Sequence, residues 1–122
     1  MSPFAWIGVG VFGAAGAYAR FAVAAAVTAR RPGAFPWGTF IVNLTGGFAL
    51  GVLTGANVTG AALFVAGTGF MGGYTTFSTW MVETQRLGED AEIGLAAAYL
   101  LGSMVAGLAA TGAGWALAGA LS

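Results

Sequence analysis

The sequence predicts an all-α membrane protein with four transmembrane helices in a single domain, residues 1–122. Apolar residues make up 58% of the chain and charged residues only 7%, a balance typical of membrane proteins rather than soluble domains. The mean hydropathy is +0.85. Short polar segments separate four apolar runs, each close to the roughly 20 residues that a helix needs to cross a bilayer.

The first two apolar runs are joined by a basic turn. We expect a helix over about residues 4–28, ended by Arg30-Arg-Pro-Gly33, because Arg prefers the headgroup region and Pro-Gly cannot continue a helix. The second helix is expected over about residues 37–55. Asn57-Val-Thr-Gly60 then predicts a tight connection to the third run.

The third run, about residues 61–82, predicts a helix broken near Gly72–Thr76. Each of the two adjacent glycines costs about 1 kcal/mol in a helix relative to Ala, and two β-branched threonines follow them. Backbone groups opened inside a bilayer need protein, water or an ion as partners. Broken membrane helices therefore often mark ion or substrate sites.

A polar loop over residues 83–92 is expected next, followed by a last helix over about residues 93–121. The loops on one side of the four-helix arrangement carry Arg30, Arg31 and Arg86. The positive-inside rule predicts that this side is cytoplasmic and that both termini lie outside.

Residue types that most enzymes use are missing from the composition. The chain has no Cys and no His, which excludes disulfides, thiol nucleophiles, imidazole proton shuttles and the usual zinc sites. We therefore expect a protein that is not an enzyme.

Small residues recur every fourth position in the second and fourth predicted helices, as at Gly47, Gly51 and Gly55, and predict close helix packing. Polar side chains at membrane depth must face protein or water. They are nearly all hydroxyls and amides: Thr39, Asn43, Thr75, Thr76, Ser78, Thr79, Tyr99, Ser103 and Thr111. Such groups suit an uncharged hydrogen-bonding path for a small anion, and hydrogen bonding between helices is the alternative.

Four further residues leave alternatives open. Arg20 reaches the interface or lines a water-filled vestibule. Phe77 and Trp80 share a helix face, where they pack or present positive ring edges to an anion. Glu83 is a cap, a solvated loop residue or a carboxylate of the site.

Three segments of the chain resemble the Fluc, or CrcB, family of fluoride channels. They are Gly16-Ala-Tyr-Ala-Arg-Phe21, Trp37-Gly-Thr-Phe-Ile-Val-Asn43 and Gly69-Phe-Met-Gly-Gly-Tyr-Thr-Thr-Phe-Ser-Thr79. The second and third segments together are highly specific, and the resemblance covers nearly the whole chain.

The resemblance implies an antiparallel, dual-topology dimer with two fluoride pores along the subunit interface. It also implies a structural Na⁺ at the dimer centre, held by the backbone carbonyls of Gly72 and Thr75. The implied function is passive export of cytoplasmic fluoride across the plasma (inner) membrane, which lowers fluoride toxicity. The expected partners are membrane lipid, fluoride and a second subunit, with no nucleic acid.

The fluoride path that the resemblance implies combines an amide, two aromatic rings, hydroxyls and a cation in the vestibule. Its residues are Asn43, Phe77, Trp80, Ser78, Thr79, Tyr99, Ser103, Thr111 and Arg20. Three positions depart from the family pattern: Trp80 replaces a second pore Phe, Met81 a Ser or Thr, and Gly107 a Ser. Either this chain forms a homodimer whose pores tolerate the three departures, or it is a half-conducting or nonconducting subunit of a heterodimer.

A small proton-coupled exporter of organic cations is the hypothesis from another class. It would need an ionisable carboxylate deep in a span, and Glu83 is the nearest candidate.

Overall fold

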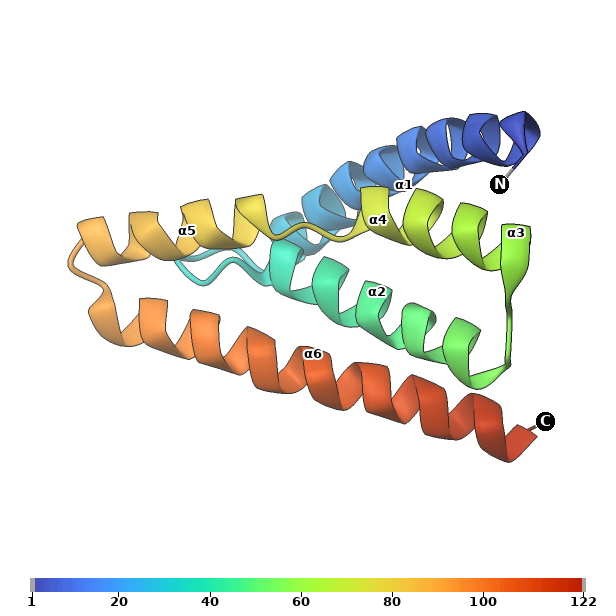
Figure 1. Cartoon of the computed structure of the whole chain (residues 1–122). Coiled ribbons are helices and arrows are strands. Elements are labelled where there is room, and N and C mark those ends of the chain that lie inside the picture. The colour runs from blue at the N-terminus through green and yellow to red at the C-terminus, as the bar shows by residue number, and fades with distance from the viewer. Residues whose placement is uncertain (1, 122) are drawn as a thin grey trace.

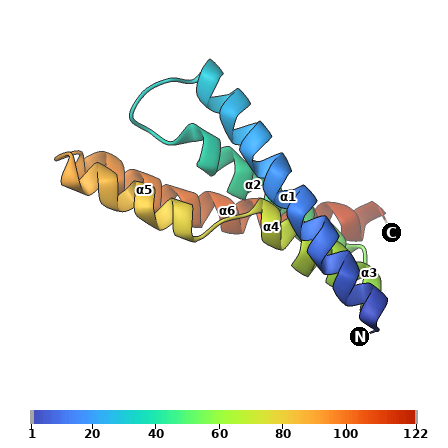
Figure 2. The same cartoon turned by 90° about the horizontal axis from the view of Figure 1, so that it is seen from above.

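The computed structural model describes residues 2–121, and the secondary structure of these residues is entirely helical (Figure 1). The elements are α1 (Pro3–Arg30), α2 (Trp37–Gly55), α3 (Gly60–Leu63), η1 (Phe64–Met71), α4 (Gly72–Tyr74), α5 (Ser78–Glu89) and α6 (Ile93–Leu121). The chain runs four times along the molecule, with α3, η1, α4 and α5 following one another as the third pass (Figures 1 and 2). Both ends of the described chain lie at the same end of the bundle.

Three helices, α1, α2 and α6, are long and apolar enough to cross a membrane. This confirms the helical membrane character that the composition predicts. α2 and α6 have the bounds expected from the sequence, and α1 continues to Arg30. The fourth expected span differs, because residues 60–89 are divided among short helices.

The interruption of the third pass lies at Thr75–Phe77, at the end of the stretch where the sequence predicts it. Gly72 and Gly73 themselves are helical, in α4. A Cβ at Gly73 would collide with the backbone carbonyl oxygen of Gly13 on α1. This glycine therefore permits close contact between two helices, and the backbone opens only at Thr75, where ψ is 160°.

The third pass also differs from the expected helix on either side of the interruption. Phe64–Met71 forms a π-helical segment, a rare geometry that often occurs at functional sites. The polar loop expected from Glu83 is instead part of α5, which continues to Glu89. Glu, Gln, Arg and Leu favour helix, and Leu87 is buried beside Ala96 of α6. Polarity alone therefore indicates a loop where an amphipathic helix forms.

α2 and α6 pack against each other along the predicted small-residue stripe. Cβ atoms at Gly51 and Gly55 would collide with the backbone of Thr111 and Trp115, which confirms the packing role of these glycines. Gly114 of α6 lies equally close to Phe48 of α2. This close pairing fixes the two helices that face the interruption of the third pass.

Candidate ion-binding groove

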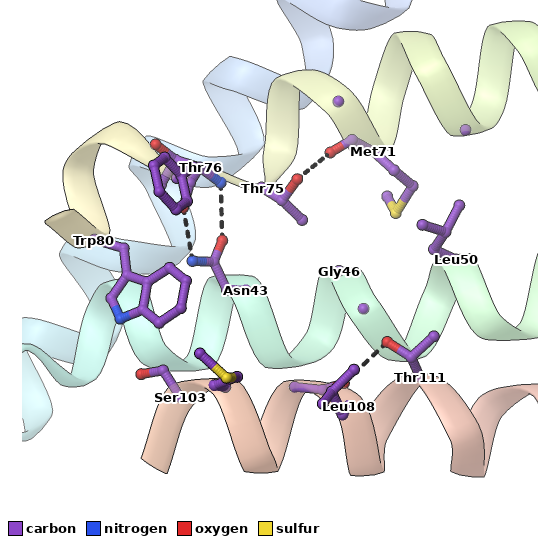
Figure 3. Close-up of a pocket in the computed structure, with 16 residues that line it drawn as sticks. Asn43, Gly46, Leu50, Met71, Thr75, Thr76, Trp80, Ser103, Leu108 and Thr111 are labelled. Atoms are coloured by element: carbon purple, nitrogen blue, oxygen red, sulfur yellow. Dashed lines mark hydrogen bonds between the residues drawn. The ribbon is translucent and has the colours of Figure 1, made fainter. Parts of the chain in front are cut away.

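A groove of about 460 Å³ lies where the interruption faces α2 and α6 (Figure 3). We call it the Asn43 groove. Its lining is Asn43, Gly46, Gly47, Leu50, Gly67, Met71, Gly72, Thr75, Thr76, Phe77, Trp80, Ser103, Met104, Gly107, Leu108 and Thr111. None of these lining residues carries a carboxylate, and the polar side chains among them are amide, hydroxyl and indole groups.

Asn43 of α2 holds the interruption through both of its side-chain polar atoms. Its Nδ2–H donates to the carbonyl oxygen of Thr76 at 2.8 Å. The backbone N–H of Thr76 donates to Asn43 Oδ1, also at 2.8 Å. The amide thus satisfies the two backbone groups of one residue in the open segment, as required inside a membrane.

The hydroxyl of Thr76 starts the next helix. Thr76 Oγ1 accepts a hydrogen bond from the backbone N–H of Thr79 at 3.2 Å and donates to Thr79 Oγ1 at 3.2 Å. A Thr side chain that accepts from the first turn is a common way to begin a helix. The first turn of α5 is therefore fixed by a residue of the interruption itself.

The hydrogen bonds donated by the backbone N–H groups of Thr76 and Thr79 leave two backbone carbonyls without their usual helical partners. In a continuous α-helix the N–H of Thr76 would donate to Gly72 C=O and that of Thr79 to Thr75 C=O, following the i to i−4 pattern. Here both N–H groups donate to side-chain oxygens instead. The carbonyls of Gly72 and Thr75 consequently lose their usual helical partners, and these are the two carbonyls that the family resemblance implies as Na⁺ ligands.

Further contacts with α2 position the end of α4, and the sequence analysis did not name three of the residues that make them, Thr45, Gly46 and Tyr74. Thr45 Oγ1 and the Tyr74 hydroxyl form a hydrogen bond of 2.9 Å. A Cβ at Gly46 would collide with the methyl group of Thr75. Thr75 Oγ1 donates back to the carbonyl of Met71 at 2.9 Å. Thr45 and Gly46 follow Asn43 by two and three residues, and this spacing was the signal that could have predicted their contacts with the interruption.

Two aromatic residues border the groove at the start of α5. The rings of Phe77 and Trp80 meet edge to face, with centroids 5.8 Å apart and planes at 88°. Phe77 is 69% exposed. Trp80 Nε1 is buried and has no hydrogen-bond partner in the described part of the chain, and the same holds for Ser103 Oγ.

The structure brings only part of the predicted fluoride path together. Asn43, Phe77, Trp80, Ser103 and Thr111 line the groove. Ser78, Thr79, Tyr99 and Arg20 are not part of its lining. The groove therefore holds five of the nine residues of the fluoride path that the resemblance implies.

The remaining predicted residues have their own neighbours. Tyr99 is 0% exposed. Its hydroxyl donates to Glu83 Oε1 at 2.9 Å. The Arg20 guanidinium carbon lies 5.1 Å from the ring centroid of Phe21. Arg20 Nε is buried without a partner among residues 2–121.

Two of the three departures from the family pattern, Trp80 and Gly107, line the groove, whereas Met81 does not. A Cβ at Gly107 would meet nothing within 4 Å. The Gly107 carbonyl accepts from Thr111 Oγ1 at 2.9 Å, so the donor of that hydroxyl is satisfied within α6. Trp80 therefore brings an indole N–H donor to the lining, and Gly107 lacks the hydroxyl donor that a Ser would bring.

A comparison with protein-family models matches residues 7–115 to the model described as "CrcB-like protein, Camphor Resistance (CrcB)". The chain belongs to the CrcB family. This confirms the resemblance drawn from its three segments. The match includes the Asn43 groove and all four passes of this CrcB chain.

Curated relatives of this CrcB chain carry consistent names. A protein of Mycobacterium tuberculosis (strain H37Rv) named "Fluoride-specific ion channel FluC 2" is 51% identical, over 86% of this chain and 83% of its own. One of Moorella thermoacetica with the same name is 45% identical, over 96% and 98%. "Fluoride-specific ion channel FluC 1" of Symbiobacterium thermophilum is 50% identical, over 64% and 68%.

Proposed function

We propose that this CrcB protein is a fluoride-specific ion channel that passively exports cytoplasmic fluoride. The observation that carries the proposal is the Asn43 groove, in which amide, hydroxyl and indole groups meet without a carboxylate. Fluoride is small and strongly hydrated, so well-placed donors in a narrow path must replace its water. The names of the curated relatives support fluoride as the ion.

The conducting unit is proposed to be an antiparallel dimer. In a single subunit Phe77, the last residue of the interruption, borders the groove and is 69% exposed. A second subunit against this face would cover the ring and complete the wall of the pore. Dimers with two-fold symmetry are the commonest oligomers, and each pore would then use groups of both chains.

A structural Na⁺ at the dimer centre fits the residues present. Gly72 and Thr75 offer carbonyl oxygens whose helical N–H partners donate elsewhere. Oxygen atoms are the ligands that hard cations take. When bound, the ion would supply positive charge to these carbonyls and tie together the interruptions of both subunits. It is not proposed as a transported ion.

The protein is a multi-pass membrane protein, and we place it in the plasma (inner) membrane with lipid around α1, α2 and α6. HF crosses lipid, dissociates in the more alkaline cytoplasm and leaves fluoride there, so passive outward flow through a channel removes it. Such a channel catalyses no chemical reaction.

The test is efflux from liposomes that contain the purified chain alone and are loaded with fluoride or chloride. After a K⁺ ionophore is added, a halide-selective electrode should record fast fluoride efflux and no chloride efflux. Equal efflux of both ions would overturn the proposed selectivity.

A second candidate is a half-conducting subunit of a heterodimer. Trp80 and Gly107 favour it, because both line the groove and both depart from the family pattern. The names FluC 1 and FluC 2 among the relatives are consistent with paired chains. Silence of the well-folded chain alone, followed by fluoride efflux after coexpression with a homologous chain, would support this candidate over the homodimer.

A further inference from the structure

A second polar pocket, of about 410 Å³, lies at the end of the bundle away from the two ends of the described chain (Figure 1). The connection between α1 and α2 forms one wall, and α5 with the turn into α6 forms the other. We call it the Arg31 pocket. It shares no lining residue with the Asn43 groove. Its volume is within the range of about 300–1,000 Å³ that small-molecule sites have.

Side chains of both charge signs line the Arg31 pocket. The cations are Arg31, which follows α1, and Arg86 of α5, and the carboxylates are Glu83, Asp90 and Glu92. Within residues 2–121, no ion pair with an N–O distance of 4.0 Å or less joins these cations to a carboxylate. Arg86 and Asp90 remain unpaired although they are four residues apart, a spacing at which helical ion pairs form. The pocket therefore presents opposite charges that do not neutralise each other.

The Arg31 pocket lies at the level where lipid headgroups would be. α1 ends at Arg30 and α2 begins at Trp37, and both helices are long and apolar enough to cross a membrane. The guanidinium carbon of Arg31 lies 5.2 Å from the ring centroid of Trp37. Arg and Trp at the ends of membrane helices both favour the headgroup region. A headgroup is therefore the ligand nearest to this pocket in a bilayer.

The free charges specify the chemistry of that headgroup. Arg31, Arg86, Asp90 and Glu92 are exposed, whereas Glu83 already accepts a hydrogen bond from a buried tyrosine hydroxyl. Guanidinium groups bind a phosphate through paired N–H donors. A primary ammonium has three N–H donors for carboxylates. The headgroup of phosphatidylethanolamine carries a phosphate and a primary ammonium two carbons apart.

Other common headgroups match these charges less well. Phosphatidylcholine has the same two charges, but its quaternary ammonium has no N–H to donate. Phosphatidylglycerol has the phosphate alone, so nothing in its headgroup would neutralise the carboxylates of Asp90 and Glu92.

We infer that the Arg31 pocket binds the headgroup of phosphatidylethanolamine, with the phosphate on Arg31 and Arg86 and the ammonium on Asp90 and Glu92. α2 and α6 begin at the two segments that form this pocket. A bound lipid joins these two segments. The inference does not depend on which ion the Asn43 groove takes.

Lipid binding is measured by native mass spectrometry of the full chain in detergent. Phosphatidylethanolamine, phosphatidylcholine and phosphatidylglycerol with the same acyl chains are titrated separately. The dissociation constant for phosphatidylethanolamine should be about tenfold lower than that for phosphatidylcholine, the effect of one hydrogen bond between charged groups. Equal binding of the three lipids, or tighter binding of phosphatidylglycerol, would reject the site.

Matched variants assign the two halves of the headgroup. Arg31→Gln should weaken binding of both phosphatidylethanolamine and phosphatidylglycerol, because both carry the phosphate. Asp90→Asn should weaken phosphatidylethanolamine about tenfold and leave phosphatidylcholine unchanged. Arg30→Gln and Glu89→Gln are the controls, since they remove the same charges at adjacent residues outside the pocket lining.

All four substitutions are at exposed positions, so the fold should be retained, and thermal midpoints verify this. If the controls lower phosphatidylethanolamine binding as much as the pocket variants do, net charge explains the binding and the site is rejected.

Free phosphoethanolamine distinguishes a lipid from a soluble ligand of the same chemistry. It lacks acyl chains, which pack along the apolar helices, so at a concentration equal to that of the lipid it should not displace phosphatidylethanolamine. Displacement at equal concentration would identify a soluble ligand and reject the lipid as the occupant.

Discussion

The side chain of Asn43 pairs with the backbone of Thr76 as a neighbouring strand would, donating to its carbonyl and accepting from its N–H, each at 2.8 Å. The two residues are 33 positions apart in the chain. One amide on α2 thus stabilises the open backbone between α4 and α5, and it diverts the N–H that Gly72 would otherwise bind. The Asn43 side chain therefore both shapes the groove and leaves the Gly72 carbonyl without its usual N–H partner.

Asn43→Asp should test this pairing, because it keeps an acceptor for the Thr76 N–H and removes the donor to the Thr76 carbonyl. A carboxylate would also oppose that carbonyl and repel anions. We expect a loss of about 1–3 kcal/mol in stability and at least a tenfold loss in fluoride efflux. Thermal unfolding in detergent and liposome efflux measure the two effects.

The matched control for this substitution is Asn57→Asp. Asn57 is exposed in the α2–α3 connection with φ of 61°, a conformation that Asp also tolerates. This variant should unfold and conduct like the original chain. Equal behaviour of the two variants would show that the amide of Asn43 has no special role.

Gly73→Ala should destabilise the protein because its Cβ would collide with the carbonyl of Gly13 in α1. Overpacking of this kind costs about 1–3 kcal/mol, and backbone atoms cannot rotate aside as a side chain does. Gly94→Ala is the control, since a Cβ there meets nothing within 4 Å. The midpoint of thermal unfolding should fall for the first variant and not for the second. A fall of similar size in both would argue against close contact at Gly73.

Hydropathy predicted the bounds of α2 and α6 because a bilayer requires a continuous apolar helix, and Pro36 and Gly55 mark where α2 begins and ends. It did not predict that α5 continues to Glu89. That segment is polar on one side, and Leu87 on its other side packs against α6. Hydropathy along the chain does not predict such tertiary contacts. The predicted break at Gly72–Thr76 overlaps the observed interruption at Thr75–Phe77, but it included Gly72 and Gly73, which are helical because Gly73 packs closely on α1.

The site was predicted by residue type and only partly by position. A polar residue inside an apolar span must have a partner, which is why Asn43, Ser103 and Thr111 could be named in advance. No rule of spacing links Asn43 to Thr76, or Thr45 to Tyr74. The second subunit and the central cation remain predictions, for which the structure of one chain supplies only the free carbonyls and the exposed Phe77.

Glu83→Gln should preserve fluoride efflux, because the Gln carbonyl still accepts from the Tyr99 hydroxyl that Glu83 binds at 2.9 Å. A proton-coupled cation exporter would lose transport, since it needs the ionisable carboxylate. The assay is liposome efflux of fluoride beside uptake of an organic cation driven by a pH gradient. Glu89→Gln on the exposed side of α5 controls for the change of charge. Loss of cation uptake in Glu83→Gln alone would favour the exporter over the channel.

Removal of Na⁺ should destabilise the dimer if the carbonyls of Gly72 and Thr75 hold the ion. A ligand at one hundred times its dissociation constant stabilises the bound state by about 2.7 kcal/mol, so the thermal midpoint should rise with Na⁺ concentration and then level off. N-methylglucamine at the same ionic strength is the control, because it is too large to enter a cage of carbonyls. An Asn43→Leu variant, which removes the acceptor, should show a smaller Na⁺ effect, because the Thr76 N–H is then available to the Gly72 carbonyl. A thermal midpoint that does not change with Na⁺ in the original chain would contradict the cation site. Water or the partner subunit would then bind the two carbonyls, and the dimer would form without a central cation.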